Sequence, residues 1–356
     1  MISLETELCR LFGIEYPIVQ AGMAGGPTTA ELVSAVSEAG GLGTLGAAYL
    51  APDAMRNTIS DIQARTRNPF AVNIFASHEK DDFSRLEEVQ KALAPFRSEL
   101  MLEKLQSSYV SPDWSAEQFE ICIELEVPII STAFGCPSKS QMESAKKHGV
   151  KVIVMVTTVK EAQQAERAGA DAVVAQGSEA GGHRSTFALE HHPQGALVGT
   201  MSLVPQVADA VSIPVIAAGG IVDGRGLVSS LVLGAQAVQI GTRFLTAKEA
   251  GTHDVHKQAV FGSDEESTVI TKVFSGRPAR GIKNRFIEEF ENGQAAPLPF
   301  PSQNTVTKDL WAAAAQHNNP EFMSLWAGQS TRMLTEEQGA ADIIQSTIRQ
   351  AQQIIG

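Results

Sequence analysis

The sequence predicts an α/β protein built as a (β/α)8 TIM barrel with a smaller helical C-terminal domain. Three observations lead to this prediction. Glycines end helical patterns and are followed at once by short apolar runs, as in residues 38–46, 147–155, 168–175 and 233–240. Eight such runs occur, and most are separated by helical patterns; the strand pattern stops near residue 245. Apolar strands that alternate with helices are typical of a parallel sheet, and eight units favour a closed barrel over an open sheet.

The predicted strands are short and apolar, and a helix that ends on glycine precedes several of them. In chain order the strands span residues 17–20, 42–45, 71–75, 128–132, 152–156, 172–175, 214–217 and 237–240. The helices predicted between them span residues 28–39, 52–65, 138–147, 159–168, 201–210 and 225–233. Residues 1–245 are therefore expected to form the barrel.

Two stretches do not follow this repeat. Residues 78–126 are rich in charged side chains and are expected to form a helical insertion after the third strand. Residues 246–356 contain helical patterns and the proline-rich connector 297–301, and they are expected to form a mainly helical C-terminal domain. Its amphipathic tail, residues 336–355, has the pattern of a last helix that returns to the outer ring of the barrel.

Composition limits the possible partners. The 28 Lys and Arg against 40 Asp and Glu give a net charge of −12, and no basic cluster is present, which argues against nucleic-acid binding. The three cysteines are widely spaced and favour neither disulfides nor a zinc site, so a reducing cytoplasm is expected. Charged residues interrupt the N-terminal segment and no apolar run is long enough for a membrane span. The choice between monomer and homodimer stays open.

The loops after the seventh and eighth strands have the features of a phosphate site. Barrel active sites lie at the carboxyl ends of the strands, and phosphates commonly bind after strands seven and eight. Gly219 and Gly220 follow the seventh strand, and Gly241 and Thr242 follow the eighth. Exposed backbone N–H groups at glycines attract phosphate oxygens, and Thr242 adds a hydroxyl. The alternative is that the glycines only form tight turns.

The loop after the sixth strand, residues 176–184, carries a candidate catalytic histidine. His183 stands directly behind Gly181 and Gly182, which would let a flat ring lie against the backbone. A histidine at a barrel mouth can act as a general base or as a hydrogen-bond donor. The alternative is a surface histidine without a role, which is the interpretation we give to the pair at residues 191–192.

Two further loops complete a binding site for a flat ring. Residues 20–26 expose backbone after the first strand, and Asn73 offers an amide after the third. A heteroaromatic ring between these loops, with its phosphate after strands seven and eight, fits FMN. No metal site is expected, because the histidines lack metal-binding spacing. The G-x-G-x-x-G match at residues 41–46 follows a helix, so it does not indicate a dinucleotide fold.

With these motifs assembled, the chain resembles the nitronate monooxygenase family, formerly called 2-nitropropane dioxygenases. The matching segments are 20–26, Asn73, 177–184, 217–221, 239–242, 275–280 and 325–329. The resemblance implies FMN as the cofactor and His183 as the active-site histidine. The loops and the resemblance together give the expected cofactor-binding set: Met23, Asn73, Gln176, Gly181, Gly182, Gly219, Gly220, Gln239, Ile240, Gly241 and Thr242.

The family's activity implies that an alkyl nitronate reacts with O2 to give nitrite and a carbonyl compound, without NAD(P)H. His183 would then bind the nitro oxygens or deprotonate a neutral nitroalkane. The resemblance also suggests propionate 3-nitronate as a substrate, with Arg184, Arg280 and Lys283 as unranked candidates to hold its carboxylate. Ser185 stands where the family commonly has glycine two places after the histidine, which leaves the shape of the substrate loop open.

Two other functions stay open from the sequence. An FMN-dependent enoyl-acyl-carrier-protein reductase that uses NAD(P)H, or an NADH:quinone reductase of the same superfamily, would share the barrel, the FMN and the histidine. A non-redox barrel that binds a phosphate ligand would share only the phosphate loops. A bound flavin would exclude the non-redox barrel, but it would not distinguish the reductases from a nitronate monooxygenase.

Overall fold

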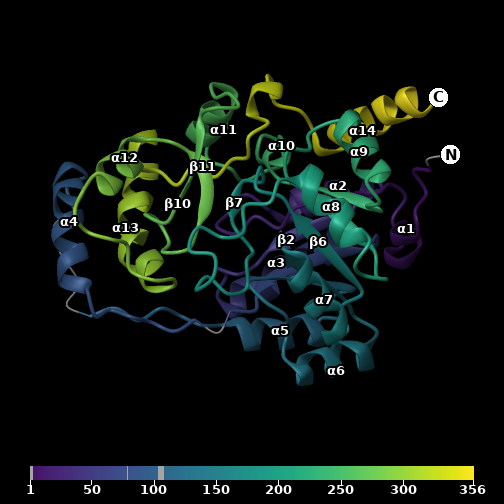
Figure 1. The fold of residues 1–356 in the computed structure, drawn as a ribbon, viewed down its shortest axis with the longest axis horizontal. Coiled ribbons are helices and arrows are strands. Elements are labelled where there is room, and N and C mark those ends of the chain that lie inside the picture. The colour runs from purple at the N-terminus through teal and green to yellow at the C-terminus, as the bar shows by residue number, and fades with distance from the viewer. Residues whose placement is uncertain (1–2, 78, 103–107) are drawn as a thin grey trace.

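The computed structural model describes residues 3–77, 79–102 and 108–356. A parallel barrel with its helices forms one part of the molecule, on the right in Figure 1. Its strands pair in the order β1-β9-β8-β6-β5-β4-β3-β2, and a parallel bridge between Val19 and Leu42 joins the two ends of this order. The predicted barrel is confirmed, and each strand bound lies within one residue of its prediction. The strands are β1 (Ile18–Gln20), β2 (Gly43–Gly46), β3 (Phe70–Phe75), β4 (Ile129–Ala133), β5 (Lys151–Val156), β6 (Ala172–Gln176), β8 (Val215–Ala218) and β9 (Ala237–Ile240).

Helices surround this barrel because local signals start and end them at defined residues. Ser138 and Gln141 form a capping box at the start of α6 (Lys139–His148), and Gly149 ends that helix with a positive φ. Strand β5 begins two residues later. The other helices of the outer ring are α2 (Ala30–Glu38), α3 (Pro52–Arg65), α5 (Ser115–Glu124), α7 (Val159–Ala168), α8 (Thr200–Ala208), α9 (Gly224–Val232) and α14 (Ala340–Ile355).

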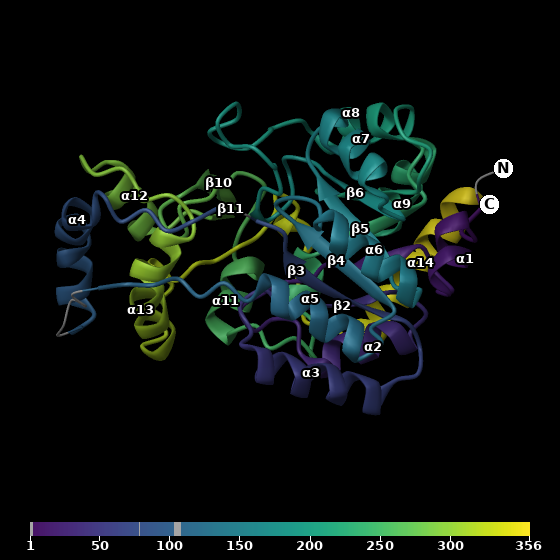
Figure 2. The same cartoon turned by 90° about the horizontal axis from the view of Figure 1, so that it is seen from below.

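Helices from both ends of the chain complete the barrel. The C-terminal helix α14 packs against α9 and α2, and both termini lie on the same side of the molecule (Figure 2). The N-terminal helix α1 (Glu7–Phe12) places Leu8, Cys9 and Phe12 in one buried cluster with the inward-facing strand residues. This cluster fills the barrel interior at the end opposite the carboxyl ends of the strands.

A second group of elements lies beside the barrel, around its own hydrophobic cluster (Figures 1 and 2). It includes a three-stranded antiparallel sheet in the order β10-β11-β7, made of β10 (Thr268–Thr271), β11 (Ala279–Ile282) and β7 (Gly182–His183). The sequence pattern predicts no strand after residue 245, and this sheet corrects that expectation. The accompanying helices are α4 (Leu86–Glu99), α11 (Asp254–Phe261), α12 (Arg285–Glu291), α13 (Ser302–Gln316), η1 (Pro320–Phe322) and η2 (Thr331–Met333). The short helix α10 (Thr242–Leu245) follows β9 and belongs to the barrel, because its Phe244 is part of the barrel cluster.

The segment predicted as an insertion, residues 78–126, is divided between these two groups. Helix α4 contributes Val89, Leu93 and Phe96 to the second cluster, whereas α5 packs against β3 and α3 of the barrel. Its first residue, His78, and residues 103–107 lie outside the described residues. Among the described helices, none combines the length and the apolar character needed to cross a membrane.

Candidate active site

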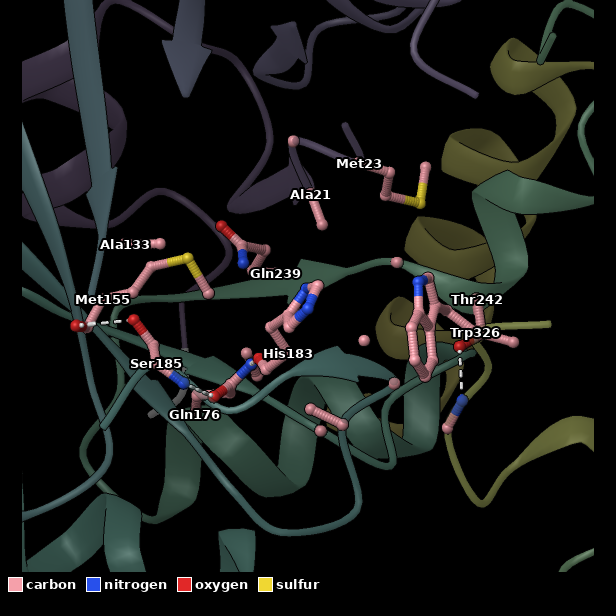
Figure 3. Close-up of a pocket in the computed structure, with 18 of the residues that line it drawn as sticks. Ala21, Met23, Ala133, Met155, Gln176, His183, Ser185, Gln239, Thr242 and Trp326 are labelled. Atoms are coloured by element: carbon pink, nitrogen blue, oxygen red, sulfur yellow. Dashed lines mark hydrogen bonds between the residues drawn. The ribbon is translucent and has the colours of Figure 1, made fainter. Parts of the chain in front are cut away.

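A cavity opens where the carboxyl ends of the barrel strands meet the second group of elements (Figure 3). The loops after β1, β6, β8 and β9 supply most of its wall, as the sequence predicts for a barrel site, and β3 adds Asn73 and Phe75 from the strand itself. The structure brings together nearly all the predicted site residues. Those that line the cavity are Met23, Asn73, Gln176, Gly181, Gly182, His183, Gly219, Gly220, Gln239, Gly241 and Thr242.

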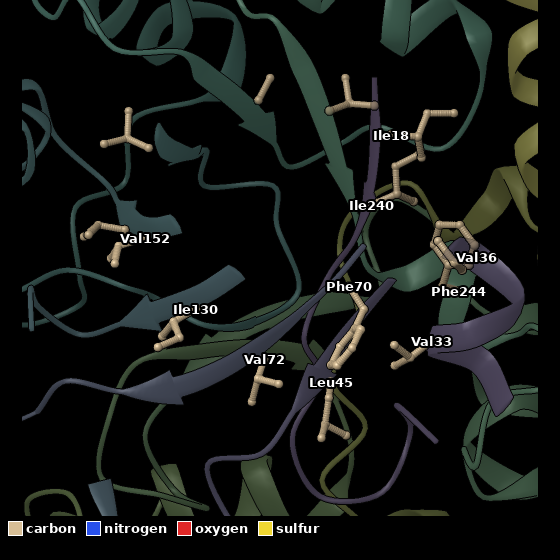
Figure 4. Close-up of a cluster of buried hydrophobic side chains, with 14 of the residues drawn as sticks. Ile18, Val33, Val36, Leu45, Phe70, Val72, Ile130, Val152, Ile240 and Phe244 are labelled. Carbon is tan, nitrogen blue, oxygen red and sulfur yellow. The ribbon is translucent and has the colours of Figure 1, made fainter. Parts of the chain in front are cut away.

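Ile240 is the exception among the predicted residues. Its side chain is 1% exposed and belongs to the hydrophobic cluster between the sheet and the outer helices (Figure 4). Neighbouring residues of a strand point to opposite faces, so Gln239 faces the cavity and Ile240 faces away. The side chain of Ile240 is therefore not available to a ligand in the cavity.

The loop that carries His183 is held by the side chain of Gln176. Its Nε2 donates to the carbonyl oxygen of His183 at 2.9 Å, and its Oε1 accepts from the backbone N–H of Ser185 at 2.9 Å. The Ser185 hydroxyl in turn donates to the carbonyl oxygen of Met155. Ser185 thus fixes the loop to β5. This is the structural role of the serine that stands where the family commonly has glycine.

His183 lies in an aromatic wall of the cavity. Its ring centroid is 5.8 Å from that of Phe134, 6.4 Å from Phe300 and 5.5 Å from Trp326. Burial, followed by the positive charge of Arg277, lowers the pKa of the imidazole to about 3. His183 is therefore neutral at physiological pH, which makes it a hydrogen-bonding group and a weak base.

Ser275 orients the imidazole of His183. The Ser275 hydroxyl oxygen lies 2.8 Å from Nε2 of His183, and it also accepts from the backbone N–H of Arg277 at 3.2 Å. Nδ1 of His183 has no hydrogen-bond partner among the described residues. The sequence marks residues 275–280 and 325–329 only as matching segments, so the roles of Ser275 and Trp326 emerge from the structure alone.

The loops after β8 and β9 form one end of the cavity. Gly219 and Gly220 adopt φ values of +115° and +73°, a conformation that side chains rarely adopt, so their backbone lies bare at the cavity wall. The carboxylate of Asp223 accepts from the first N–H groups of α9, so that helix end is already capped. A phosphate would therefore bind to the glycine loops themselves rather than to α9.

Thr242 has a protein partner at the cavity wall, and its hydroxyl proton stays available for the phosphate oxygen expected of it. Its hydroxyl accepts from the backbone N–H of Gly328 at 3.0 Å and so ties the C-terminal segment to the cavity. The lack of a side chain at Gly181 lets the same C-terminal segment approach closely, because a Cβ at Gly181 would lie 2.5 Å from the carbonyl carbon of Ala327. These contacts hold Trp326 over the loop of His183.

The middle of the cavity fits a flat heteroaromatic ring. Asn73 is buried and donates through Nδ2 to Ser131 at 3.1 Å, while the side-chain amide of Gln239 makes no hydrogen bond to a described residue. Ala21, Met23 and Ala133 supply apolar surface to the same cavity, and Figure 3 shows them with Gln239. An apolar slot with two amides and a glycine-lined end matches the ring and the phosphate of a flavin mononucleotide.

None of the three cations considered for a substrate carboxylate lines the cavity. Arg184 is fully buried and donates to the carbonyl oxygens of Gly177, Gln176 and Ala196 at 2.7, 2.8 and 3.1 Å. Arg280 donates to Ser178 and Thr268, and Lys283 pairs with Glu288 at the surface. Arg184 and Arg280 therefore stabilise loops through hydrogen bonds. The expectation that Arg184, Arg280 or Lys283 holds a substrate carboxylate in this cavity is wrong.

The described part of the chain also contains no group of His, Cys, Asp or Glu side chains placed to hold a metal ion. The site therefore offers amides, bare backbone, the neutral imidazoles of His183 and His256, the carboxylate of Glu179 and aromatic rings. Such a set suits a bound organic cofactor that carries out the redox chemistry.

Comparison with known proteins decides the family. A sequence model described as nitronate monooxygenase matches residues 5–350. The chain belongs to the nitronate monooxygenase family. A probable nitronate monooxygenase of Staphylococcus saprophyticus is 42% identical, with 99% of each chain covered, and one of Staphylococcus aureus is 43% identical, with 99% of this chain and 98% of the relative covered.

Solved structures agree with this membership. The nitroalkane oxidase from Streptomyces ansochromogenes is 37% identical, with a TM-score of 0.89 over 97% of this chain and 98% of that one. FabK from Thermotoga maritima is 32% identical, with a TM-score of 0.76 over 99% and 98%. As a member of the nitronate monooxygenase family, this chain is a flavin-dependent oxidoreductase with a TIM-barrel fold.

Proposed function

We propose that this chain is an FMN-dependent nitronate monooxygenase. It would oxidise alkyl nitronates, including propionate 3-nitronate, with O2 to a carbonyl compound and nitrite, without NAD(P)H. The observation that carries this proposal is a neutral His183 held between aromatic rings at the edge of the flavin-sized slot. A nitronate is a small anion whose charge is spread over carbon and two oxygens, so one neutral hydrogen-bond donor in an apolar wall suits it.

The residues that would hold FMN are those already described in the cavity. Gly219, Gly220 and Gly241 would face the phosphate, and the amides of Asn73 and Gln239 would face the polar edge of the ring. When bound, FMN would accept the electrons that the nitronate loses and pass them to O2. Met23 and Ala21 would cover an apolar part of the ring.

His183 would position the nitronate rather than deprotonate a nitroalkane. The Ser275 hydroxyl has two acceptors within reach, Nε2 of His183 at 2.8 Å and the carbonyl oxygen of Arg277 at 3.1 Å. Donation to the nearer acceptor leaves the imidazole proton on Nδ1, where it can be donated to a nitro oxygen. A nitronate has already lost its carbon-bound proton, so the low basicity of His183 does not slow the reaction.

Aromatic side chains would keep water away from the reacting anion. Phe75, Phe134 and Phe300 are in mutual ring contact at centroid distances of 4.4 to 6.0 Å. The Trp326 ring also contacts His183, at a centroid distance of 5.5 Å. In such a setting a hydrogen bond to a delocalised charge is stronger than in water.

The second candidate function is an NAD(P)H-dependent enoyl-thioester reductase. The likeness to FabK, at 32% identity over almost the whole chain, is the observation that favours it. The two functions differ in the electron donor, because a reductase needs a pyridine nucleotide and a nitronate monooxygenase does not. The test must therefore vary the donor.

The experiment uses purified protein loaded with FMN. Aerobic addition of an alkyl nitronate should release nitrite without any pyridine nucleotide, and His183→Ala should keep the bound flavin yet lose most of the turnover. His191→Ala, at an exposed histidine, is the matched control and should leave turnover unchanged. Nitrite release that appears only when NADH or NADPH is added would overturn the proposal, and unchanged turnover in His183→Ala would remove that histidine from the mechanism.

A further inference from the structure

A buried positive charge lies directly behind the aromatic wall of the cavity. The ionisable side chains that line the described cavity are Tyr49, Glu179, His183 and His256, so no lysine or arginine is among them. Arg277 nevertheless places its guanidinium carbon 3.9 Å from the centroid of the Phe134 ring, and its side chain is 1% exposed. An anionic substrate beside His183 would therefore meet this charge through one aromatic ring.

Arg277 is connected to His183 by two routes. Through its side chain, it packs on Phe134, whose ring lies edge-on to the imidazole of His183. Through its backbone, its N–H donates to the Ser275 hydroxyl, which bonds to Nε2 of the same imidazole. A substitution of the Arg277 side chain would therefore change the charge near His183, whereas the backbone hydrogen bond that orients its ring through Ser275 would remain.

The charge of Arg277 is only partly compensated. Its Nη1 donates to the carboxylate of Glu79 at 2.7 Å, and its Nη2 donates to the carbonyl oxygen of Thr186. The Glu79 side chain is 34% exposed, so water screens it, whereas the guanidinium is almost fully buried. The carboxylates of Glu161 and Glu190 also act on the Arg277 charge. The field of Arg277 at His183 is nevertheless positive, because this charge is the second cause, after burial, of the low pKa of the imidazole.

We propose that Arg277 is a positioning residue that attracts the anionic substrate to His183 through the Phe134 ring without touching it. This inference rests on the proposed function, because it assumes an anionic substrate at His183. It explains how a chain with a net charge of −12 and no cation on the described cavity wall can bind an anion. Glu79, by the same argument, weakens that attraction.

The distances set the size of the effect. The guanidinium lies 3.9 Å from the Phe134 centroid and that centroid 5.8 Å from His183, so the charge and the imidazole are at most about 10 Å apart. At an effective dielectric constant of about 20, one unit charge at that distance changes the affinity for an anion roughly tenfold. Removal of the more distant, screened Glu79 charge should change it about two- to threefold in the opposite direction.

The test measures binding of nitrate, a planar anion with the shape of a nitronate group, to the flavin-loaded protein. Its Kd is read from the change in the flavin absorption spectrum in wild type, Arg277→Met, Arg277→Lys and Glu79→Gln. We expect about tenfold weaker binding in Arg277→Met, binding near the wild-type value in Arg277→Lys, and about two- to threefold tighter binding in Glu79→Gln. Nitromethane, which is neutral at pH 7, is the control ligand and should bind all four proteins alike.

The opposite signs separate an electrostatic role from a structural one. If Arg277 and Glu79 served only as a clamp between two loops, both Arg277→Met and Glu79→Gln would weaken nitrate binding, and that result would overturn the proposal. If Arg277→Met does not fold, the Glu79→Gln variant decides. Nitrate binding by Glu79→Gln that is unchanged or weaker than in wild type contradicts the proposal. Nitrate binding requires no turnover, so a failure of this inference is distinct from a failure of wild type to release nitrite.

Discussion

His183 is expected to stay neutral from pH 8 down to about pH 5. Burial among aromatic rings and, second to it, the charge of Arg277 lower its pKa to about 3. A group with that pKa is about 1% protonated at pH 5, whereas a histidine with an ordinary pKa near 6.5 is about 97% protonated at that pH. Lowering the pH from 8 to 5 therefore leaves His183 almost entirely neutral, whereas a histidine with an ordinary pKa becomes almost fully protonated.

The same shift determines how stability depends on pH. The folded-state pKa lies below the unfolded value, so protons favour the unfolded chain. The stability that comes from a neutral His183 is complete above about pH 6.5 and is lost as the pH falls towards about 3. Within this window the unfolded chain binds up to one more proton, so this group lowers the free energy of unfolding by up to about 1.4 kcal/mol per pH unit.

Nuclear magnetic resonance of nitrogen-labelled histidine gives the direct assay. The resonance present in wild type and missing in His183→Asn belongs to this side chain, and it should keep the shift of a neutral imidazole from pH 8 to pH 5. Urea unfolding at pH 5 and pH 7 should show a steeper loss of stability in wild type than in the variant. A resonance of His183 that titrates near pH 6.5 would refute the reasoning.

Three substitutions test the supports of the site. Ser275→Ala removes the hydrogen bond at Nε2 of His183, so kcat should fall about tenfold, with the bound flavin retained; an unchanged kcat would contradict the orienting role. Arg184→Met removes the buried hydrogen bonds to three carbonyl oxygens, of which that of Gly177 keeps another donor, the N–H of Ala180, and it should lower the free energy of unfolding by about 3–5 kcal/mol in urea; a higher KM with unchanged stability would instead restore Arg184 as a substrate anchor. Gly181→Ala forces a Cβ to within 2.5 Å of the Ala327 carbonyl carbon, so the fluorescence of Trp326 should change, and identical spectra would argue against this contact.

Local signals explain why the barrel could be predicted from the sequence. Helix α7 begins at a capping box of Thr158 and Glu161 and ends at Gly169, whose φ is positive, and β6 follows after two residues. Such signals are complete within a few residues of chain. The loops at the carboxyl ends follow directly from them, which is why Gly219 and His183 could be placed at the cavity before the structure was known.

Contacts between distant segments explain what the sequence did not predict. Strand β7 has two residues and pairs with β11 about a hundred residues later, so no run of apolar residues marks either strand. That pairing brings Ser275, Arg277 and Trp326 to His183. The sequence motif predicts residues 239–242 as one cofactor-binding run, whereas the alternation of side chains along a strand separates Ile240 from Gln239.

The most direct test of the proposed activity compares electron donors in the absence of oxygen. Flavin-loaded protein is mixed with an alkyl nitronate in one sample and with NADH or NADPH in another, and the flavin absorbance near about 450 nm is followed. We expect rapid bleaching by the nitronate and none by the pyridine nucleotides on the same timescale. Rapid bleaching by NADH or NADPH, with no bleaching by the nitronate, would contradict it and favour the reductase.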